Sequence, residues 1–167
     1  MIFYVMSNDV VPPCPLCQNP LHYRGQKKRV MKQEGGKKQW LVIRRFKCCS
    51  CHSLHKELPD CLVPYKHYQA DIISGVLDGI VTPDDLDCED YPCLDTMLLW
   101  IRWFNQNLKR IEGLLHKARY EVTGNKEELL YPHSSLLTRL RTHTPNWLEQ
   151  VIHTIYNSGG FLVPVSR

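Results

Sequence analysis

The sequence predicts an α+β protein, with a β-hairpin near its N-terminus and helices in the rest of the chain. Three observations support this prediction. Two Cys-x2-Cys pairs flank residues 18–47, a β-rich stretch with two adjacent glycines lies between the pairs, and apolar residues recur at helical spacing from about residue 68 onward. We therefore expect residues 1–64 to form one domain and residues 65–167 to form a second, helical domain.

The four paired cysteines indicate a metal site. Each Cys-x2-Cys pair can turn two sulfurs toward one point, and a hairpin between the pairs brings the two points together. Four thiolates arranged as a tetrahedron suit Zn²⁺. The sequence thus predicts one structural zinc in a zinc ribbon, and the expected ligands are Cys14, Cys17, Cys48 and Cys51.

Other roles for these cysteines stay open at this stage. They could form disulfides or be ordinary buried thiols. The short apolar run at residues 2–6 has no basic segment before it, so we do not expect an export signal, and paired cysteines in a reducing compartment more often bind metal. Cys49 is interpreted as a spare thiol, while His52, His55 and Cys61 could replace one of the ligands.

The segment Leu21 to Lys47 is expected to form the hairpin. Gly35-Gly36 suits a two-residue turn that needs positive φ angles. In residues 39–47 apolar side chains occur on both faces of the second strand. One face should cover the next domain or the turns at the two Cys-x2-Cys pairs, which we call the metal knuckles. The basic ends should remain in water. A ribbon this small buries little core, so the metal should supply most of its stability.

Five helices are expected after an extended, proline-containing connector at 58–64. The first runs from about 68 to 79, and a short second helix begins at Thr82-Pro83 and ends before Pro92. The longest spans 94–119, and the C-terminal helices lie within 133–157, followed by an extended tail at 161–165. The apolar seam of the long helix is expected to pack within its own domain, although a homodimer through helix 94–119 is also open. The seam residues are Met97, Ile101, Phe104, Leu108, Ile111, Leu115 and Ala118.

Positive charge is concentrated in the predicted hairpin. Eleven Lys or Arg residues and one acidic residue, Glu34, lie between His22 and Lys56, whereas Asp84 to Asp95 contains six acids and no base. Such a cluster resembles the electrostatic footprint of a nucleic-acid-binding protein. A solvated hairpin that only maintains solubility is the alternative. The expected phosphate contacts are Lys27, Lys28, Arg29, Lys37, Lys38, Arg44, Arg45 and Lys47.

Several motifs resemble the N-terminal DNA-binding part of bacterial transposases, and small bacterial zinc-ribbon and helix-turn-helix proteins associated with mobile elements. The matching segments are Cys14-Pro15-Leu16-Cys17, residues 43–48 with Cys51, Leu58-Pro59 with Pro64, and residues 92–97 with Trp100. The resemblance implies a helix-turn-helix-like unit at 67–119, in which Thr96 and Arg102 contact DNA; helices that serve only as a scaffold are the alternative. Cys93 and Leu99 depart from the pattern, which has a serine and a basic residue there.

The leading functional hypothesis is a non-catalytic, zinc-dependent DNA-binding protein with double-stranded DNA as its partner. The resemblance implies a mobile-element accessory factor or transcriptional regulator, with a transposase or recombinase as a further partner. The alternative is a protein-interaction adaptor with a structural zinc and a helical partner-binding surface. Catalysis is not expected, because a closed site of four cysteines leaves no coordination position for water. Apolar runs too short to cross a bilayer favour a cytoplasmic location without membrane contact.

Overall fold

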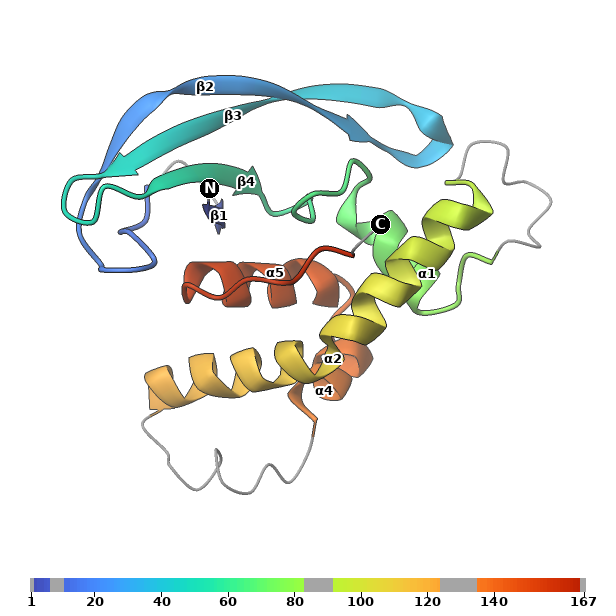
Figure 1. Cartoon of the computed structure of the whole chain (residues 1–167). Helices are drawn as coiled ribbons and strands as arrows, with labels where there is room; N and C mark the ends of the chain where they lie inside the picture. The colour runs from blue at the N-terminus through green and yellow to red at the C-terminus, as the bar shows by residue number, and fades with distance from the viewer. Residues whose placement is uncertain (1, 7–10, 83–91, 124–134, 166–167) are drawn as a thin grey trace.

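The computed structural model describes residues 2–6, 11–82, 92–123 and 135–165, and only the backbone of strand 2–6. It has the predicted α+β architecture, with a sheet in the N-terminal region followed by helices (Figure 1). The strands are β1 (Ile2–Met6), β2 (Leu21–Lys32), β3 (Lys38–Cys48) and β4 (Leu54–Pro59). The helices are α1 (Ala70–Leu77), α2 (Leu94–Thr123), α4 (Leu136–His143) and α5 (Trp147–Asn157).

The sheet has the strand order β1-β4-β3-β2. The pairs β2–β3 and β3–β4 are antiparallel, and β1 is parallel to β4. Strands β2 and β3 form the expected hairpin. Strand β1 was not predicted, because five consecutive apolar residues show no alternation that would distinguish a strand. Its pairing covers the edge of β4 that β3 leaves open.

The turn of the hairpin differs from the prediction of two residues at Gly35-Gly36. Lys32 pairs with Lys38, so residues 33–37 form a five-residue loop that contains a 3-10 turn at Glu34–Gly36. Gly36 has a φ of +67°. Longer hairpin loops are commonly a helical turn closed by a residue in the left-handed region, and glycine adopts that conformation without a steric penalty.

The prediction that one face of β3 is covered holds only in part. Both faces of β3 are covered, each at a different end of the strand. Ile43 is buried, and Leu41 on the same face packs against the main core. Phe46 and Cys48, on the opposite face, are buried at the metal end, where Phe46 packs with Leu21 in a small separate cluster. The hairpin therefore contacts the helices at one end and the cysteine cluster at the other.

Helix α5 lies at the centre of the molecule. It packs against β1, α1, α2 and α4, and Figure 1 shows it between the sheet and the outer helix layer. One cluster of buried side chains joins Met31, Leu58 and Leu62 to these helices. This core draws on residues from both sides of position 64. The division into domains 1–64 and 65–167 stays a prediction.

The long helix α2 packs within the molecule, as expected, but its predicted seam needs correction. Ile101 and Leu108 are 38% and 37% exposed, whereas Trp100, Trp103 and Asn107 are buried. The other five residues of the predicted seam are buried, so only these two positions face away from the core: the buried ones are Met97, Phe104, Ile111, Leu115 and Ala118. Asn107 donates to and accepts from the backbone of Val163, at 3.0 and 2.9 Å, which holds the C-terminal tail as an extended segment.

The remaining helix predictions have mixed outcomes. The short helix expected between Thr82 and Pro92 falls on 83–91, outside the described residues. Helix α5 begins at Trp147, after the expected Thr144-Pro145 start, and ends at Asn157 before Gly159, whose φ is +73°. Across the residues that the structure describes, no helix combines the length and apolar character needed to cross a bilayer.

Candidate metal centre and basic face

The four predicted ligands come together at one end of the sheet. The sulfur atoms of Cys14, Cys17, Cys48 and Cys51 all lie within 4.8 Å of one another. The Cys14–Cys51 sulfurs are 3.7 Å apart and the Cys17–Cys48 sulfurs are 3.4 Å apart. All four are free thiols. These four cysteines could therefore hold a metal ion, as predicted.

The sulfur spacing fits tetrahedral coordination better than disulfide bonding. A Zn–S bond of about 2.3 Å places the corners of a tetrahedron about 3.8 Å apart. A disulfide would require about 2.05 Å between two sulfurs. The sulfur–sulfur distances of 3.4 and 3.7 Å lie near the value for a tetrahedral zinc site and far from that of a disulfide. Each Cys-x2-Cys pair contributes two of the four sulfurs.

Two similar knuckles position these sulfurs. In the first, the Gln18 N–H donates to the Cys14 carbonyl (2.8 Å) and Gln18 has a φ of +59°. In the second, the Cys48 N–H donates to the Ser53 carbonyl (3.0 Å) and His52 has a φ of +58°. The residue directly after the second cysteine thus takes the left-handed conformation in both knuckles, which reverses the chain. Neither residue is a glycine, so the sequence did not indicate these turns.

The environment divides the four thiols into two kinds. Burial raises the pKa of Cys14 to about 12 and also raises the pKa of Cys48. Hydrogen bonds from the side chain and backbone of Asn19 lower the pKa of Cys17 to about 6, and Ser53 lowers the pKa of Cys51 in the same way. Each knuckle therefore has one readily ionised thiol and one buried thiol. Because metals bind thiolates, loading the cluster must release protons.

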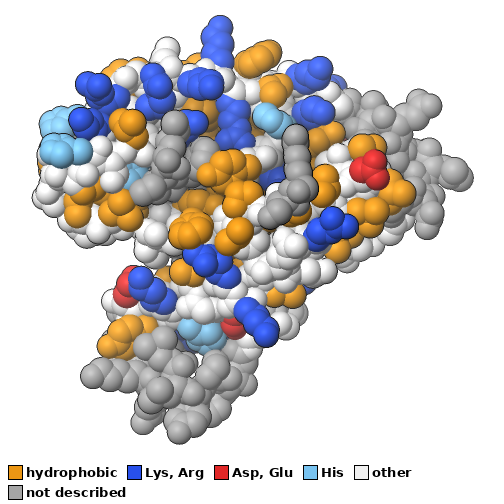
Figure 2. Space-filling model, in the orientation of Figure 1, with side chains coloured by type: hydrophobic (Ala, Val, Ile, Leu, Met, Phe, Trp, Pro, Cys, Tyr) orange, Lys and Arg blue, Asp and Glu red, His pale blue; other side chains and the backbone are white. Residues whose placement is uncertain are grey.

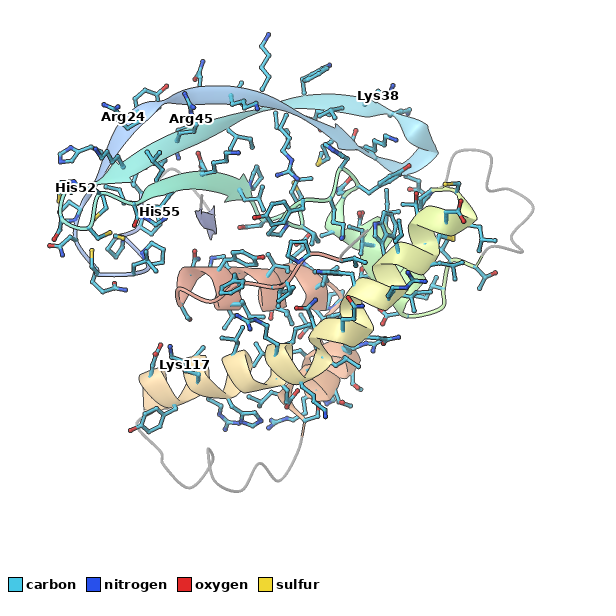
Figure 3. All side chains as sticks on the ribbon, viewed as in Figure 1. Arg24, Lys38, Arg45, His52, His55 and Lys117 are labelled. Carbon is cyan, nitrogen blue, oxygen red and sulfur yellow. The ribbon has the colours of Figure 1, made fainter. Side chains whose placement is uncertain are left out.

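His55 lies directly beside the cluster. Its Nε2 atom is 3.4 Å from the Cys14 sulfur, and the residue is 1% exposed. Burial lowers the pKa of His55, which favours the neutral ring. In the tautomer that carries the proton on Nε2, the ring can donate a hydrogen bond to the Cys14 sulfur, and outer contacts of this kind orient the ligands of a metal site. The geometry gives His55 this supporting position, while the cluster itself consists of the four cysteines (Figure 3).

The expected phosphate contacts lie mainly on the hairpin. Lys27, Lys28, Lys37, Lys38 and Arg45 are exposed, and Lys47 is half-buried. Figure 2 shows Lys and Arg side chains gathered over the strands, with few acidic side chains among them. We name these five exposed residues, which occupy both sides of the hairpin and its loop, the basic face.

Two predicted contacts have structural partners. Arg44 donates to both carboxylate oxygens of Glu57, at 2.6 and 2.9 Å. Arg29 is partly buried and donates to the backbone carbonyls of Val63 (3.5 Å) and Lys66 (2.5 Å). Both guanidinium groups hold the sheet to adjacent segments, so they are less available to an external ligand than the basic face.

A β-bulge adds one more cation to the hairpin. Tyr23 pairs with Phe46 and Gly25 pairs with Arg45, which leaves Arg24 as the extra residue, and Gly25 has a φ of +118°. The bulge places Arg24 beside Arg45 (Figure 3). Arg24 was not among the predicted contacts. A glycine inside a strand pattern was the available signal, since it often marks a bulge.

The predicted contacts on α2 lie in the first turns of that helix, in the helical part. Arg102 is exposed, whereas Thr96 is half-buried and its hydroxyl is 3.3 Å from the Cys93 sulfur. Helix α1 and helix α2 are separated by residues 78–93, of which 83–91 are not described. Their arrangement as a helix-turn-helix stays a prediction.

The fold and the cluster define an α+β protein with four clustered cysteines that could hold a metal ion. Comparison with protein families gives one match, which covers residues 14–100 and carries the description "Domain of unknown function (DUF6431)". Because the match covers more than half of the chain, this protein belongs to that family. The matched region, residues 14–100, includes the cysteine cluster, the hairpin, α1 and the start of α2. No curated protein and no solved structure matches the chain.

Proposed function

We propose that this protein is a zinc-dependent, non-catalytic DNA-binding protein that docks its hairpin on the phosphate backbone. The observation that supports the proposal most directly is the basic face, which lies on one hairpin whose base adjoins the cysteine cluster. Lys and Arg side chains that neutralise phosphates release counterions, and this release supplies most sequence-independent affinity for DNA. Double-stranded DNA is the expected partner.

The metal has a structural role in this proposal. Four thiolates fill a tetrahedral site, so no position remains for a reacting water. Thiolate ligands in this geometry suit zinc or iron. Metal analysis of the purified protein should find about one zinc per chain, because tetrahedral sites of four cysteines are typical of structural zinc. Iron in place of zinc would contradict the metal assignment without changing the structural role.

The salt dependence of DNA binding tests the docking surface. Five phosphate contacts on B-DNA predict that log K falls with log salt concentration with a slope of about −4 to −5. Replacing Lys38 and Arg45 by glutamine should reduce the steepness of this slope by about 2. A matched control replaces Lys117 and Arg139 by glutamine, which removes the same charge from the helical part. Figure 3 shows Lys117 on α2, across α5 from Lys38 and Arg45.

The control should keep the slope of the unmodified protein. Equal effects of the two double substitutions would mean that net charge, and not the basic face, governs binding. A protein that binds no duplex DNA even at low salt would refute the proposed function altogether.

A specific observation favours a second candidate, a protein-interaction adaptor. Leu94, Leu98, Ile101 and Leu108 are 49%, 49%, 38% and 37% exposed. Their spacing of four, three and seven residues places them along one side of α2. Exposed apolar stripes of this kind are typical of helix-mediated association. Light scattering on the unmodified protein and on Leu98→Lys tests the simplest case, a homodimer that the substitution should dissociate.

A further inference from the structure

A pocket of about 520 Å³ lies between the hairpin, β4 and the segment around residues 65–67. Val30, Ile43 and His67 line part of the pocket, and the other lining side chains are of two kinds. Four are cationic and two are aromatic, and the described lining residues include no carboxylate. They are Lys27, Lys28, Arg29, Lys56, Trp40 and Tyr65.

The cations make the pocket strongly electropositive. Burial lowers the pKa of Lys56, and the charges of Lys27, Arg29 and Arg45 lower it further. The same charges that disfavour the Lys56 ammonium would favour an anion in this position. Arg29 also fastens the pocket wall, because its guanidinium binds the carbonyls of Val63 and Lys66. The wall is therefore in place before a ligand arrives.

The aromatic side chains are unusually accessible. Trp40 is 66% exposed, whereas Trp100, Trp103 and Trp147 are 2–3% exposed. Tyr65 is 56% exposed and has a φ of +64°, a conformation that is rare for a bulky side chain. Strained backbone and exposed aromatic rings both concentrate at binding sites. A cationic groove with accessible aromatic faces is the combination that binds unpaired nucleotides, whose bases stack on the rings.

We propose that this pocket binds an unpaired nucleotide of a nucleic-acid strand, with phosphates on Lys27, Lys28 and Lys56 and a base stacked on Trp40 or Tyr65. The proposal rests on the proposed function and deepens it by naming the form of nucleic acid. An intact duplex keeps its bases stacked on one another, so it can satisfy the cations but not the aromatic faces. The full chain should therefore prefer DNA with a single-stranded gap over the same DNA fully paired.

Tryptophan fluorescence can report directly on this pocket. The chain has four tryptophans, and Trp40 alone among them is exposed, so it supplies the solvent-sensitive part of the emission. The probes are a random 30-base-pair duplex, the same duplex with a five-nucleotide gap, oligo(dT) and inorganic polyphosphate. Gapped DNA and oligo(dT) should quench this emission, since a stacked base contacts the indole ring. Polyphosphate should bind without quenching, because it has no bases.

Two substitutions then test the contribution of each ring. Trp40→Ala or Tyr65→Ala should weaken binding to gapped DNA by about 5- to 150-fold, the usual range for one stacked base, and leave duplex binding nearly unchanged. Tyr23→Ala is the matched control. Tyr23 is 56% exposed, the same as Tyr65, and lies on the same hairpin as Trp40 but outside the pocket lining. Unchanged zinc content and melting temperature in each variant exclude a folding defect.

The outcomes separate the two proposals. Loss of affinity for gapped DNA in the pocket variants, with none in Tyr23→Ala, supports the pocket. If the pocket variants bind gapped DNA as tightly as the unmodified protein while duplex binding keeps its steep salt dependence, the pocket assignment is wrong and the proposed function stands. If no nucleic acid binds, both are wrong.

Discussion

Replacing Cys51 by serine should remove the metal and unfold one end of the sheet while the helices remain folded. The two ends of the hairpin are stabilised by different means. At the end near the helices, Met31 belongs to the main core. At the cysteine end, the described apolar cluster consists of Phe46 with Leu21 packed against it. The metal end therefore depends on the ion.

The magnitudes support this division. The two knuckles, residues 14–19 and 48–53, comprise twelve residues, and ordering them costs about 12–24 kcal/mol at about 1–2 kcal/mol per residue. Burying Phe46 and Leu21 contributes about 3–6 kcal/mol. A structural zinc contributes about 10–16 kcal/mol at neutral pH, which is close to the difference. Without the ion, the knuckles should be disordered.

Amide hydrogen exchange, combined with metal analysis, measures this effect region by region. Amides of the knuckles should lose protection in Cys51→Ser, whereas amides of the buried helix α5 should keep it. Cys49→Ser is the matched control, because Cys49 is an exposed thiol outside the cluster. Knuckle amides that stay protected in Cys51→Ser, or equal metal loss in Cys49→Ser, would refute this reasoning.

Three further predictions concern the rest of the fold. Glu57→Gln should lower the free energy of unfolding by about 1–3 kcal/mol in urea titrations, because it breaks the two-bond ion pair with Arg44; an equal loss in an Arg44→Gln background would show that the pair is not coupled. Asp78→Ala should cost about 1–3 kcal/mol in thermal unfolding, because the indole N–H of the buried Trp147 donates to Asp78 at 2.8 Å and would lose its acceptor; an unchanged melting temperature would contradict this. Burial raises the pKa of Tyr156 from 10 to about 12, so the stability that it contributes is complete below pH 10 and should be lost as the pH rises toward 12. Tyr156→Phe should remove the part of the absorbance rise at 295 nm that occurs near pH 12, and a loss of amplitude near pH 10 instead would show that Tyr156 ionises normally.

The sequence predicted the fold class and the cysteine cluster well, because both depend on short-range spacing. Two Cys-x2-Cys pairs around a β-rich stretch leave few alternatives for the chain path. The five-residue loop at 33–37 was harder to predict, since adjacent glycines suit several turn types. Strand β1 depends on a partner, β4, that lies about fifty residues away in the chain, and local patterns carry no signal for such pairing.

The candidate binding surface was predicted by residue type and corrected by geometry. Local charge identified the hairpin as basic, but it could not show that Arg44 pairs with Glu57 or that Arg29 binds backbone carbonyls. Both partners follow these arginines in the chain by more than ten residues. The pocket with Trp40 and Tyr65 was missed for the same reason, because the two rings belong to different segments that only the tertiary fold brings together.

The attachment of the hairpin at both ends has a mechanical consequence. Most hairpins are fixed at their base and free at their loop. Here the base is fixed at the cysteine cluster, and Lys32, next to the loop, exchanges backbone hydrogen bonds with the segment at His67 and Gln69. The charged middle of the hairpin is thus held at both ends, so its curvature is set before any partner binds. Little conformational entropy is then lost on binding. Release of a metal ion would free the cysteine end of the hairpin, while the attachment at Lys32 would remain. The hairpin could then move about that attachment without leaving the molecule.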